Sequence, residues 1–390
     1  MTRKILSITG TRADYGLMTP VFQSICRSSV LNLELIVTGM HLLPEFETSL
    51  SKIRDDDFCP LHFVSMVLAE DSGKAMAQSL GFAIYGIAQI IDANKPDILL
   101  LQGDRGEMLA GAMTAAHMNL PIVHMSGGDY SGSIDDSIRN AISKFAHIHL
   151  TTCSLSTKRL LEMGETVERI FEVGEPGLDL INNMDFISPM ELAREFHLDL
   201  FKPIILATQH PVTTEAELGA WQIEQTLEAL AELKYQTIFT YPNSDSGGRE
   251  MVKKLLNYKD KDFIRIIPNL GSAKYLSLMR IASVLVGNSS SGILEAPSFK
   301  LPVVNIGSRQ YGRLRAGYII DVDYNKNQIK KAIQYALTDE KYRVGLAVCV
   351  NPYGDGNTAA KTVDILQHLA ITPTLVAKWV RNETQAFLRE

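Results

Sequence analysis

The strongest constraint on the fold is an alternation of short apolar runs with longer segments of helical periodicity, which extends through nearly the whole chain. Each run is apolar at consecutive positions, so a strand formed from it would be buried on both faces. Strands of this kind, separated by helices, are typical of parallel sheets with helices on both sides. The runs are 4–10, 33–39, 61–67, 97–103, 122–127, 148–153, 170–176, 203–210, 237–243, 263–269, 283–290, 302–307 and 318–323.

The length of 390 residues favours more than one core, because single cores rarely grow beyond about 250–300 residues. The turn-rich segment around residues 176–190 marks the division. We therefore expect an α/β protein with two Rossmann-like domains, residues 1–177 and 178–370, that face each other across a cleft. Residues 374–388 have helical spacing, so we expect the segment 371–390 to form a helix that packs back on the first domain.

Composition and charge exclude several classes of protein. A hydrophobic content of 46% and a charged content of 21% are ordinary for a soluble globular protein. The net charge of −6 argues against broad nucleic-acid binding. The four cysteines show no metal-ligand spacing, so we predict reduced thiols and no metal site. No apolar run approaches the ~20 residues that span a bilayer, and no signal peptide is evident. A cytoplasmic enzyme or binding protein without membrane partners is the expectation.

The turn after the first run, GTRADYG (10–16), has the features of a small anion site. It lacks the GxGxxG fingerprint, which makes a nicotinamide dehydrogenase unfavourable. Gly10 permits a tight turn, a helix is predicted to start near Ala13, and Arg12 lies at that helix N-terminus. Backbone amides and a guanidinium together suit a phosphate. The alternative is an ordinary turn with a surface arginine.

Acidic side chains follow two neighbouring runs at their carboxyl ends, where open α/β sheets bind ligands. Asp104 follows the run 97–103, and Asp129 lies in the loop after 122–127. The alternative for Asp104 is a helix cap. Because a second acidic cluster follows the next strand, we expect both clusters to lie near one ligand.

The second cluster opens a helix. Ser133-Ile134-Asp135-Asp136 resembles a capping box. Helical spacing places Asp135 at the margin of the apolar stripe and Asp136 on the solvated side, with Arg139 within reach of both. Asp135 is therefore the better candidate for chemistry. The alternative is that these acids only complement the helix dipole and stabilise turns.

The second half carries donors for an anion. His210 ends the run 203–210 and is a candidate phosphate donor or general acid. In VGNSSSGILEAP (286–297), a glycine turn and three serines precede a predicted helix start, and Glu295 could accept both hydroxyls of a ribose. Among further polar candidates, Asn243 and Asn269 end the runs 237–243 and 263–269, and Arg309 and Arg313 follow the run 302–307. The sequence thus indicates an enzyme for a phosphorylated or nucleotide-linked polar substrate.

These motifs resemble those of the UDP-N-acetylglucosamine 2-epimerase family, in particular its hydrolysing branch, which feeds sialic-acid-type sugar synthesis. The resemblance covers nearly the whole chain and implies the two-domain fold of GT-B glycosyltransferases. It also implies a homodimer or homotetramer and no cofactor. The motifs that carry it are GTRADYG, QGDR, HMSGGDYSGSIDDSIR, TQHPVTT, YPNSD, GNSSSGILEAP and NIGSRQ.

The resemblance implies a reaction and a role for each candidate. Anti-elimination of UDP would give a 2-acetamidoglucal, and syn-addition of water would then give N-acetylmannosamine with inversion at carbon 2. Asp104 and Asp135 match positions implicated in the sugar chemistry, with Asp129 and His210 as further catalytic candidates. The implied UDP-binding residues are Ser289 and Ser290 for the diphosphate, Glu295 for the ribose, and Arg12, His210 and Arg309 beside the phosphates, with Asn243 and Asn269 as additional contacts.

One position departs from the family. Members often carry glutamate two residues after the histidine that matches His124, and this chain has Ser126. Ser126 is therefore a candidate sugar contact, and Asp129 is a candidate replacement for the missing acid. The pocket could instead suit UDP-2,4-diacetamido-2,4,6-trideoxyglucose, which leads to legionaminic-type sugars. Two other readings stay open, namely a GT-B glycosyltransferase and a nucleotide-sugar sensor without catalysis.

Overall fold

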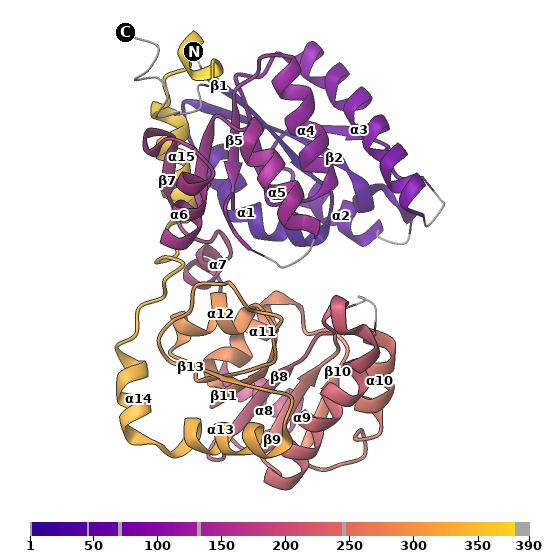
Figure 1. Cartoon of the computed structure of the whole chain (residues 1–390), viewed down its shortest axis with the longest axis vertical. Coiled ribbons are helices and arrows are strands. Elements are labelled where there is room, and N and C mark those ends of the chain that lie inside the picture. The colour runs from indigo at the N-terminus through magenta and orange to yellow at the C-terminus, as the bar shows by residue number, and fades with distance from the viewer. Residues whose placement is uncertain (1, 45–46, 69–71, 131–133, 244–246, 379–390) are drawn as a thin grey trace. The chain divides into compact units, whose positions relative to one another are not determined.

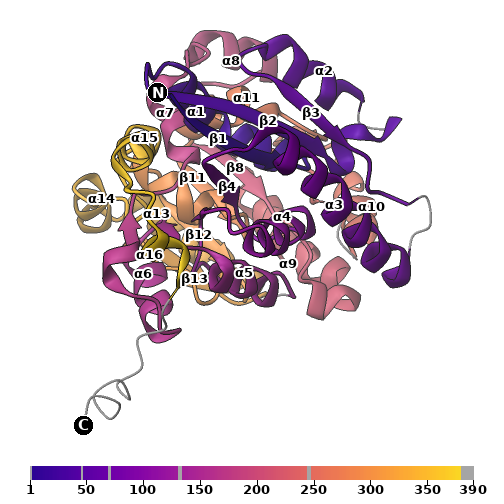
Figure 2. The same cartoon turned by 90° about the horizontal axis from the view of Figure 1, so that it is seen from above.

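The computed structural model describes residues 2–44, 47–68, 72–130, 134–243 and 247–378. The chain divides into two compact units, drawn in Figures 1 and 2. The first unit comprises Met1–Leu180 and Tyr353–Glu390, and the second comprises Ile181–Pro352. Each unit contains one parallel sheet, which confirms the predicted α/β class with two Rossmann-like units. The cleft between them stays a prediction.

The first unit is built on a seven-stranded sheet in the order β3-β2-β1-β4-β5-β6-β7, with all neighbours parallel. This is the doubly wound order, in which the direction of winding reverses beside the first strand. The strands are β1 (Arg3–Thr9), β2 (Leu31–Thr38), β3 (Leu61–Val64), β4 (Ile98–Gln102), β5 (Ile122–Met125), β6 (Ile148–Thr151) and β7 (Ile170–Glu172).

Helices cover both faces of this sheet because successive strand residues point to opposite sides. Ile98 and Leu100 join the core under α1 and α15, whereas Leu99 and Leu101 join the core under α3, α4 and α5. The consecutive apolar residues of each run therefore fill two cores. The helices are α1 (Arg12–Cys26), α2 (Glu47–Asp56), α3 (Gly73–Asn94), α4 (Gly106–His117), α5 (Ile134–Phe145), α6 (Ser154–Glu162), α7 (Gly177–Asn183), α15 (Thr358–His368) and α16 (Pro373–Val376).

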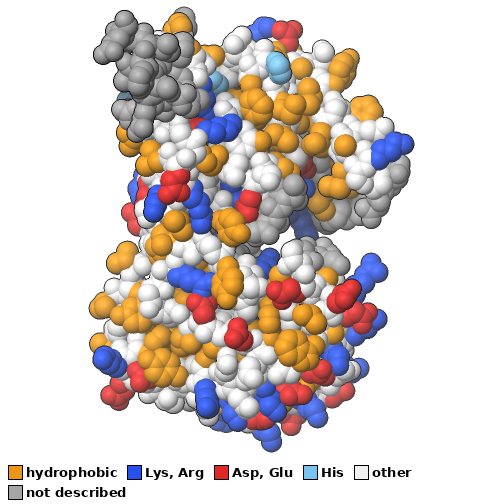
Figure 3. All heavy atoms as spheres, viewed as in Figure 1, with side chains coloured by type: hydrophobic (Ala, Val, Ile, Leu, Met, Phe, Trp, Pro, Cys, Tyr) orange, Lys and Arg blue, Asp and Glu red, His pale blue; other side chains and the backbone are white. Residues whose placement is uncertain are grey.

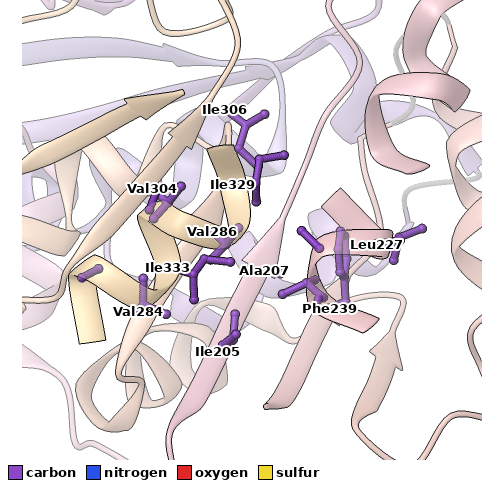
Figure 4. Close-up of a cluster of buried hydrophobic side chains, with 14 of the residues drawn as sticks. Ile205, Ala207, Leu227, Phe239, Val284, Val286, Val304, Ile306, Ile329 and Ile333 are labelled. Atoms are coloured by element: carbon purple, nitrogen blue, oxygen red, sulfur yellow. The ribbon is translucent and has the colours of Figure 1, made fainter. Parts of the chain in front are cut away.

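The second unit repeats this winding on six parallel strands in the order β10-β9-β8-β11-β12-β13. Its strands are β8 (Ile204–Thr208), β9 (Gln236–Thr240), β10 (Ile264–Ile267), β11 (Val284–Gly287), β12 (Val303–Ile306) and β13 (Ile319–Val322). Its helices are α8 (Pro189–Phe196), α9 (Gly219–Leu233), α10 (Gly248–Leu256), α11 (Gly271–Ile281), α12 (Ser291–Leu294), α13 (Lys326–Thr338) and α14 (Glu340–Ala347). Figure 4 shows the core in which Ile205 and Val286 meet Ile333 of α13.

The chain returns to the first unit earlier than the sequence indicates. Residues 353–370, which the sequence assigns to the second domain, lie with the first unit. In α15, Leu366 is buried in the core that also contains Ile25 of α1. Asp179 caps α15 from far away in sequence, because its carboxylate accepts from the amides of Thr358 (2.8 Å) and Ala359 (2.7 Å). Helical periodicity shows that α15 has an apolar face but not which sheet that face covers.

The C-terminal helix expected over 374–388 lies largely outside the described residues, which end at 378. Within them α16 is a single turn, and Leu375 is buried in the core of the first unit. Lys378 pairs with the buried carboxylate of Glu165 at 2.7 Å. In the described ranges, no helix is long and apolar enough to cross a membrane.

Each sheet reverses its winding at one parallel strand pair, β1 with β4 and β8 with β11. At the carboxyl end of the second pair the two backbones lie in contact. Gly287 has φ +131°, and a Cβ there would lie 1.9 Å from the carbonyl oxygen of Thr208. Only glycine fits this position. The close approach places the loops after β8 and β11 side by side.

Gly287→Ala should therefore destabilise the second unit by roughly 3 kcal/mol or more, from backbone strain together with overpacking. Gly81→Ala is the matched control, because Gly81 lies exposed in α3 with nothing within 4 Å of its added Cβ. That control should be neutral or stabilising by up to about 1 kcal/mol. Thermal midpoints measure both variants, and an unchanged midpoint for Gly287→Ala would show that the strand pair can separate.

Candidate functional site

The predicted site residues follow the carboxyl ends of strands, and half of them follow the two strand pairs where the winding reverses. Crevices for ligands form at such points in open α/β sheets. In the first unit, Arg12 follows β1, Asp104 follows β4 and Ser126 follows β5. In the second unit, His210 follows β8 and Ser289 follows β11. Each unit therefore has its own polar cluster.

Arg139 of α5 joins the two acidic clusters of the first unit. Its guanidinium, whose side chain is only 8% exposed, forms an ion pair with the carboxylate of Asp104. It also contacts Asp136 Oδ1 at 3.0 Å and the carbonyl oxygen of Asp129 at 2.8 Å. The structure thus brings together acids from the loops after β4 and β5, as the sequence predicts.

The first turn of α5 differs from the expectation at Asp136. This side chain is only 18% exposed and pairs with Arg139, whereas the sequence predicts a solvated position. Asp135, predicted at the margin of the buried stripe, is exposed. Helical spacing fixes the direction of each Cβ, but the charge of Arg139 one turn later decides where the flexible carboxylate rests.

Asp104 has the electrostatics of a proton acceptor. Burial raises the pKa of its carboxyl above the ordinary 3.8, Arg139 lowers it, and the nearby charges of Asp135 and Asp136 raise it again. The net direction is upward, so this carboxylate holds a proton more tightly than an exposed aspartate. Asp104 and Asp135 thus lie close enough to influence each other while differing in exposure, which suits two distinct roles in acid–base chemistry.

Asp129 is engaged elsewhere. Its carboxylate Oδ1 accepts hydrogen bonds from the hydroxyls of Thr152 (2.6 Å) and Ser156 (2.5 Å), which flank the start of α6. These bonds fix the loop after β5 to α6. The arrangement makes Asp129 a support for the loop that Arg139 holds through the Asp129 carbonyl.

Ser126 occupies a constrained position after β5. Its residue is 4% exposed, its φ is +62°, and its hydroxyl has no hydrogen-bond partner among the described residues. His124, two residues earlier, is fully buried, and burial lowers its pKa to about 3. The neutral ring therefore donates from Nε2 to the carbonyl of Gly103 at 2.8 Å, which fixes the residue before Asp104.

The turn after β1 is supported by a buried glutamate, Glu107 of α4. α1 begins at Arg12, which is exposed, with Thr11 and Asp14 forming a capping box. Glu107 lies buried beneath this turn, and a Cβ on Gly10 would approach its Oε1 to 2.6 Å. A Cβ on Gly39 would approach the same oxygen to 2.5 Å. In the sequence, the only hint of this close packing is that a glycine directly follows each of two adjacent strands, Gly10 after β1 and Gly39 after β2.

In the second unit, His210 has a defined tautomer. Its Nδ1 accepts from the backbone amide of Asn243 at 3.0 Å. Burial, reinforced by the nearby charge of Arg309, lowers the pKa of the ring to about 4. The ring is therefore neutral near pH 7 and carries its hydrogen on Nε2. Of the two roles expected for His210, this state suits a hydrogen-bond donor to an anion better than a general acid.

The serine-rich turn after β11 forms a chain of hydroxyls. Ser289 Oγ accepts from Ser291 Oγ at 2.9 Å, and Ser291 Oγ is 2.8 Å from the hydroxyl of the partly buried Tyr275. Tyr275 lies in α11, and its position there does not distinguish it in the sequence from the apolar residues of that helix. Ser290 is partly buried at the N-cap of α12. Asn269 is exposed, and its side chain accepts from the amide of Gly271 at 2.9 Å, as a turn residue would.

Glu295 is the C-cap residue of α12. One of its carboxylate oxygens, Oε2, is buried and accepts no hydrogen bond from the described residues. Burial raises the pKa of this carboxyl to about 7, and Arg313 only partly opposes that rise. Buried acceptors are almost always satisfied in folded proteins, so this oxygen has the capacity to accept a hydrogen bond from a ligand.

Arg139→Met should destabilise the first unit by ~2–4 kcal/mol, because it leaves Asp104 and Asp136 close together without their cation. Adding Asp104→Asn should restore most of the thermal midpoint by removing one of the repelling charges. Equal midpoints for the single and double variants would show that Arg139 acts through packing and not through charge.

Glu295→Gln should remove a pH dependence of stability. The pKa of the folded carboxyl (about 7) exceeds its ordinary 4.5, so the folded state binds the proton more tightly than the unfolded state. The free energy of unfolding therefore falls as the pH rises from about 4.5 to about 7. The shift is equivalent to at most about 3 kcal/mol. The variant should come closest to the wild type below pH 4.5 and exceed its thermal midpoint at pH 8. Glu250→Gln, an exposed change on α10, serves as the control.

Comparison with known proteins agrees with this geometry. Residues 23–367 match the family described as UDP-N-acetylglucosamine 2-epimerase. The solved structure of UDP-GlcNAc 2-epimerase from Neisseria meningitidis bound to UDP-GlcNAc has a TM-score of 0.78 at 17% identity, covering 93% of this chain and 99% of that one. At that identity the likeness shows a shared fold.

Three curated relatives are similar along most of their length. The hydrolysing UDP-N,N'-diacetylbacillosamine 2-epimerase of Legionella pneumophila is 37% identical, over 97% of this chain and 99% of its own. The hydrolysing GDP/UDP-N,N'-diacetylbacillosamine 2-epimerase of Campylobacter jejuni is 38% identical, over 83% and 85%. The UDP-N-acetylglucosamine 2-epimerase of Neisseria meningitidis is 35% identical, over 92% and 93%. With the family match, these identities show that the chain belongs to the UDP-N-acetylglucosamine 2-epimerase family.

Proposed function

We propose that this protein is a hydrolysing 2-epimerase that acts on UDP-N,N'-diacetylbacillosamine, which is UDP-2,4-diacetamido-2,4,6-trideoxyglucose. The products would be UDP and the free 2-epimer, 2,4-diacetamido-2,4,6-trideoxymannose. The sequence ranks UDP-N-acetylglucosamine first and this sugar second. The relatives reverse that ranking, because the two most similar of the three act on diacetylbacillosamine by name.

The observation that carries the enzymatic assignment is the pair Asp104 and Asp135, two interacting carboxylates of unequal exposure at the carboxyl end of the first sheet. A largely buried carboxylate such as Asp104 costs stability when it has no function. A binding protein without catalysis does not need two acids there, and an inverting glycosyltransferase needs a single base. Epimerisation needs one proton removed from carbon 2 and one returned to its other face.

The proposed reaction has two steps. In the first, the bond between carbon 1 and the diphosphate oxygen breaks, and its electron pair leaves with UDP. A carboxylate then takes the proton from carbon 2, and the glycal double bond forms. In the second, water adds its oxygen to carbon 1 and gives one proton to a carboxylate, while an acid delivers a proton to carbon 2. The sum is the substrate plus water giving UDP plus the free sugar.

The donors of the second unit suit the departing UDP. Neutral His210, the guanidinium of Arg309 and the hydroxyls of Ser289 and Ser290 can stabilise negative charge on the diphosphate as it develops. The orphaned carboxylate oxygen of Glu295 can accept from the ribose hydroxyls. Arg12 at the start of α1 is a further cation for the phosphates.

Ser126 supports the trideoxy sugar over UDP-N-acetylglucosamine. The site lacks the glutamate often found there in the family and has instead a small buried hydroxyl without a partner. The N–H of a 4-acetamido group could donate a hydrogen bond to the oxygen of such a hydroxyl. The alternative substrate is UDP-N-acetylglucosamine, with release of N-acetylmannosamine. The Neisseria relative, named a UDP-N-acetylglucosamine 2-epimerase, supports this alternative.

The test follows both UDP-sugars by proton NMR in D₂O with purified protein. We expect UDP and the free trideoxymannose derivative with deuterium at carbon 2, and a kcat/KM at least ~10-fold above that for UDP-N-acetylglucosamine, since matched polar groups discriminate strongly. Preference for UDP-N-acetylglucosamine would replace the proposed substrate. A product still linked to UDP would exclude hydrolysis.

Asp135→Asn supplies the catalytic control for this experiment. It should lower kcat more than ~100-fold, as expected on loss of an acid–base group, and leave the Kd for UDP within about twofold. Asp92→Asn, which alters an exposed ion pair on α3, should change neither quantity. Loss of UDP binding in Asp135→Asn would remove its proposed role at the sugar.

A further inference from the structure

Asn288, the first residue after β11, holds the main chain of His210 with both ends of its side-chain amide. Its Oδ1 accepts from the His210 amide at 2.6 Å, and its Nδ2 donates to the His210 carbonyl at 2.9 Å. The side chain is fully buried. These two bonds continue the β8–β11 pairing, whose last register pair is Thr208 with Gly287, by one side chain.

The ring of His210 is fixed from its other side. Asn243, which follows β9, donates its backbone amide to Nδ1 at 3.0 Å. That bond selects the tautomer with hydrogen on Nε2, provided that the main chain of His210 stays where Asn288 holds it. The groups whose charge acts on this ring include Arg309, which disfavours the imidazolium. Asn288 and Asn243 together determine the direction of the Nε2–H bond.

The carbonyl of Asn288 anchors the next pair of donors. It accepts from Arg309 Nη1 at 3.2 Å and from Gln310 Nε2 at 2.8 Å. Gln310 is 2% exposed, so this anchor is buried. One residue thus contacts the histidine after β8 through its side chain and the arginine after β12 through its main chain.

We propose that Asn288 is a positioning residue that sets the separation and direction of the two diphosphate donors, His210 and Arg309. The inference deepens the proposed function, since it rests on UDP binding by the second unit. Asn288 is not placed in contact with the ligand. It acts by holding His210 Nε2–H and the Arg309 guanidinium ready for the charge that develops on UDP.

The chemistry of the side chain explains why an amide is needed. A carboxylate in its place has no donor for the His210 carbonyl and adds negative charge near the diphosphate. An alanine makes neither bond but keeps the main-chain carbonyl. Asn288→Ala therefore removes the two side-chain hydrogen bonds to His210 and keeps the main-chain hydrogen bond to Arg309.

The test is a double-mutant cycle on UDP binding by calorimetry, with the full-length protein as wild type. We expect Asn288→Ala and His210→Ala each to weaken UDP binding by roughly 10–100-fold, the range for one hydrogen bond to a charged group. The double variant should bind within about twofold of His210→Ala, because Asn288 acts through that ring. In ¹⁵N NMR, Asn288→Ala should reduce the population of the Nε2–H tautomer of His210.

Asn305→Ala is the matched control. Asn305 is equally buried on β12, and its side chain bonds Asp321 at 2.7 Å, away from His210. It should lower the thermal midpoint without changing the Kd for UDP. Equal weakening by Asn305→Ala, or additive effects in the cycle, would overturn the positioning role. Wild-type protein that does not bind UDP would overturn the proposed function itself. Should Asn288→Ala not fold, Asn288→Ser takes its place in the cycle, because its short neutral side chain cannot make both bonds to His210.

Discussion

The parallel strand pairs β1 with β4 and β8 with β11 are the constraint on which the rest of this molecule depends. In each sheet the winding reverses at that pair, so the two connections start next to each other and then run to helices on opposite faces of the sheet. In the second sheet the pair is so close that Gly287 has no room for a side chain against Thr208. The loops after β8 and β11 consequently lie side by side, and Asn288 bonds across them.

The two units stabilise their buried ionisable groups differently. In the first unit one guanidinium, Arg139, lies between carboxylates from separate loops, and the pKa of Asp104 still rises because burial outweighs that cation. In the second unit burial and a neighbouring cation keep His210 neutral. The first arrangement suits proton transfer, whereas the second suits fixed donors to an anion. Figure 3 shows that Lys, Arg, Asp and Glu side chains are otherwise scattered over the face it displays.

Much of the fold could be predicted from local pattern. Consecutive apolar residues such as Ile98–Leu101, alternating with segments of helical periodicity, indicate strands buried on both faces of a sheet, so the class follows from the sequence. The capping box at Thr11 and Asp14 likewise fixes the start of α1, within one residue of the predicted position. The destination of α15 could not be predicted, because its apolar face would suit either sheet and the cap from Asp179 is distant in sequence.

The sequence by itself determined the family, the two parallel sheets and the list of polar residues that follow their strands, because these depend on periodicity and on motifs of adjacent residues. Tertiary structure alone decided which of those residues interact. It joined Asp104 to Arg139, committed the carboxylate of Asp129 to α6, buried Glu107 beneath Gly10 and made Asn288 the link between His210 and Arg309. The physical reason is that hydrogen bonds and ion pairs require contact in space, and contact between separate loops is set by strand order and not by position along the chain.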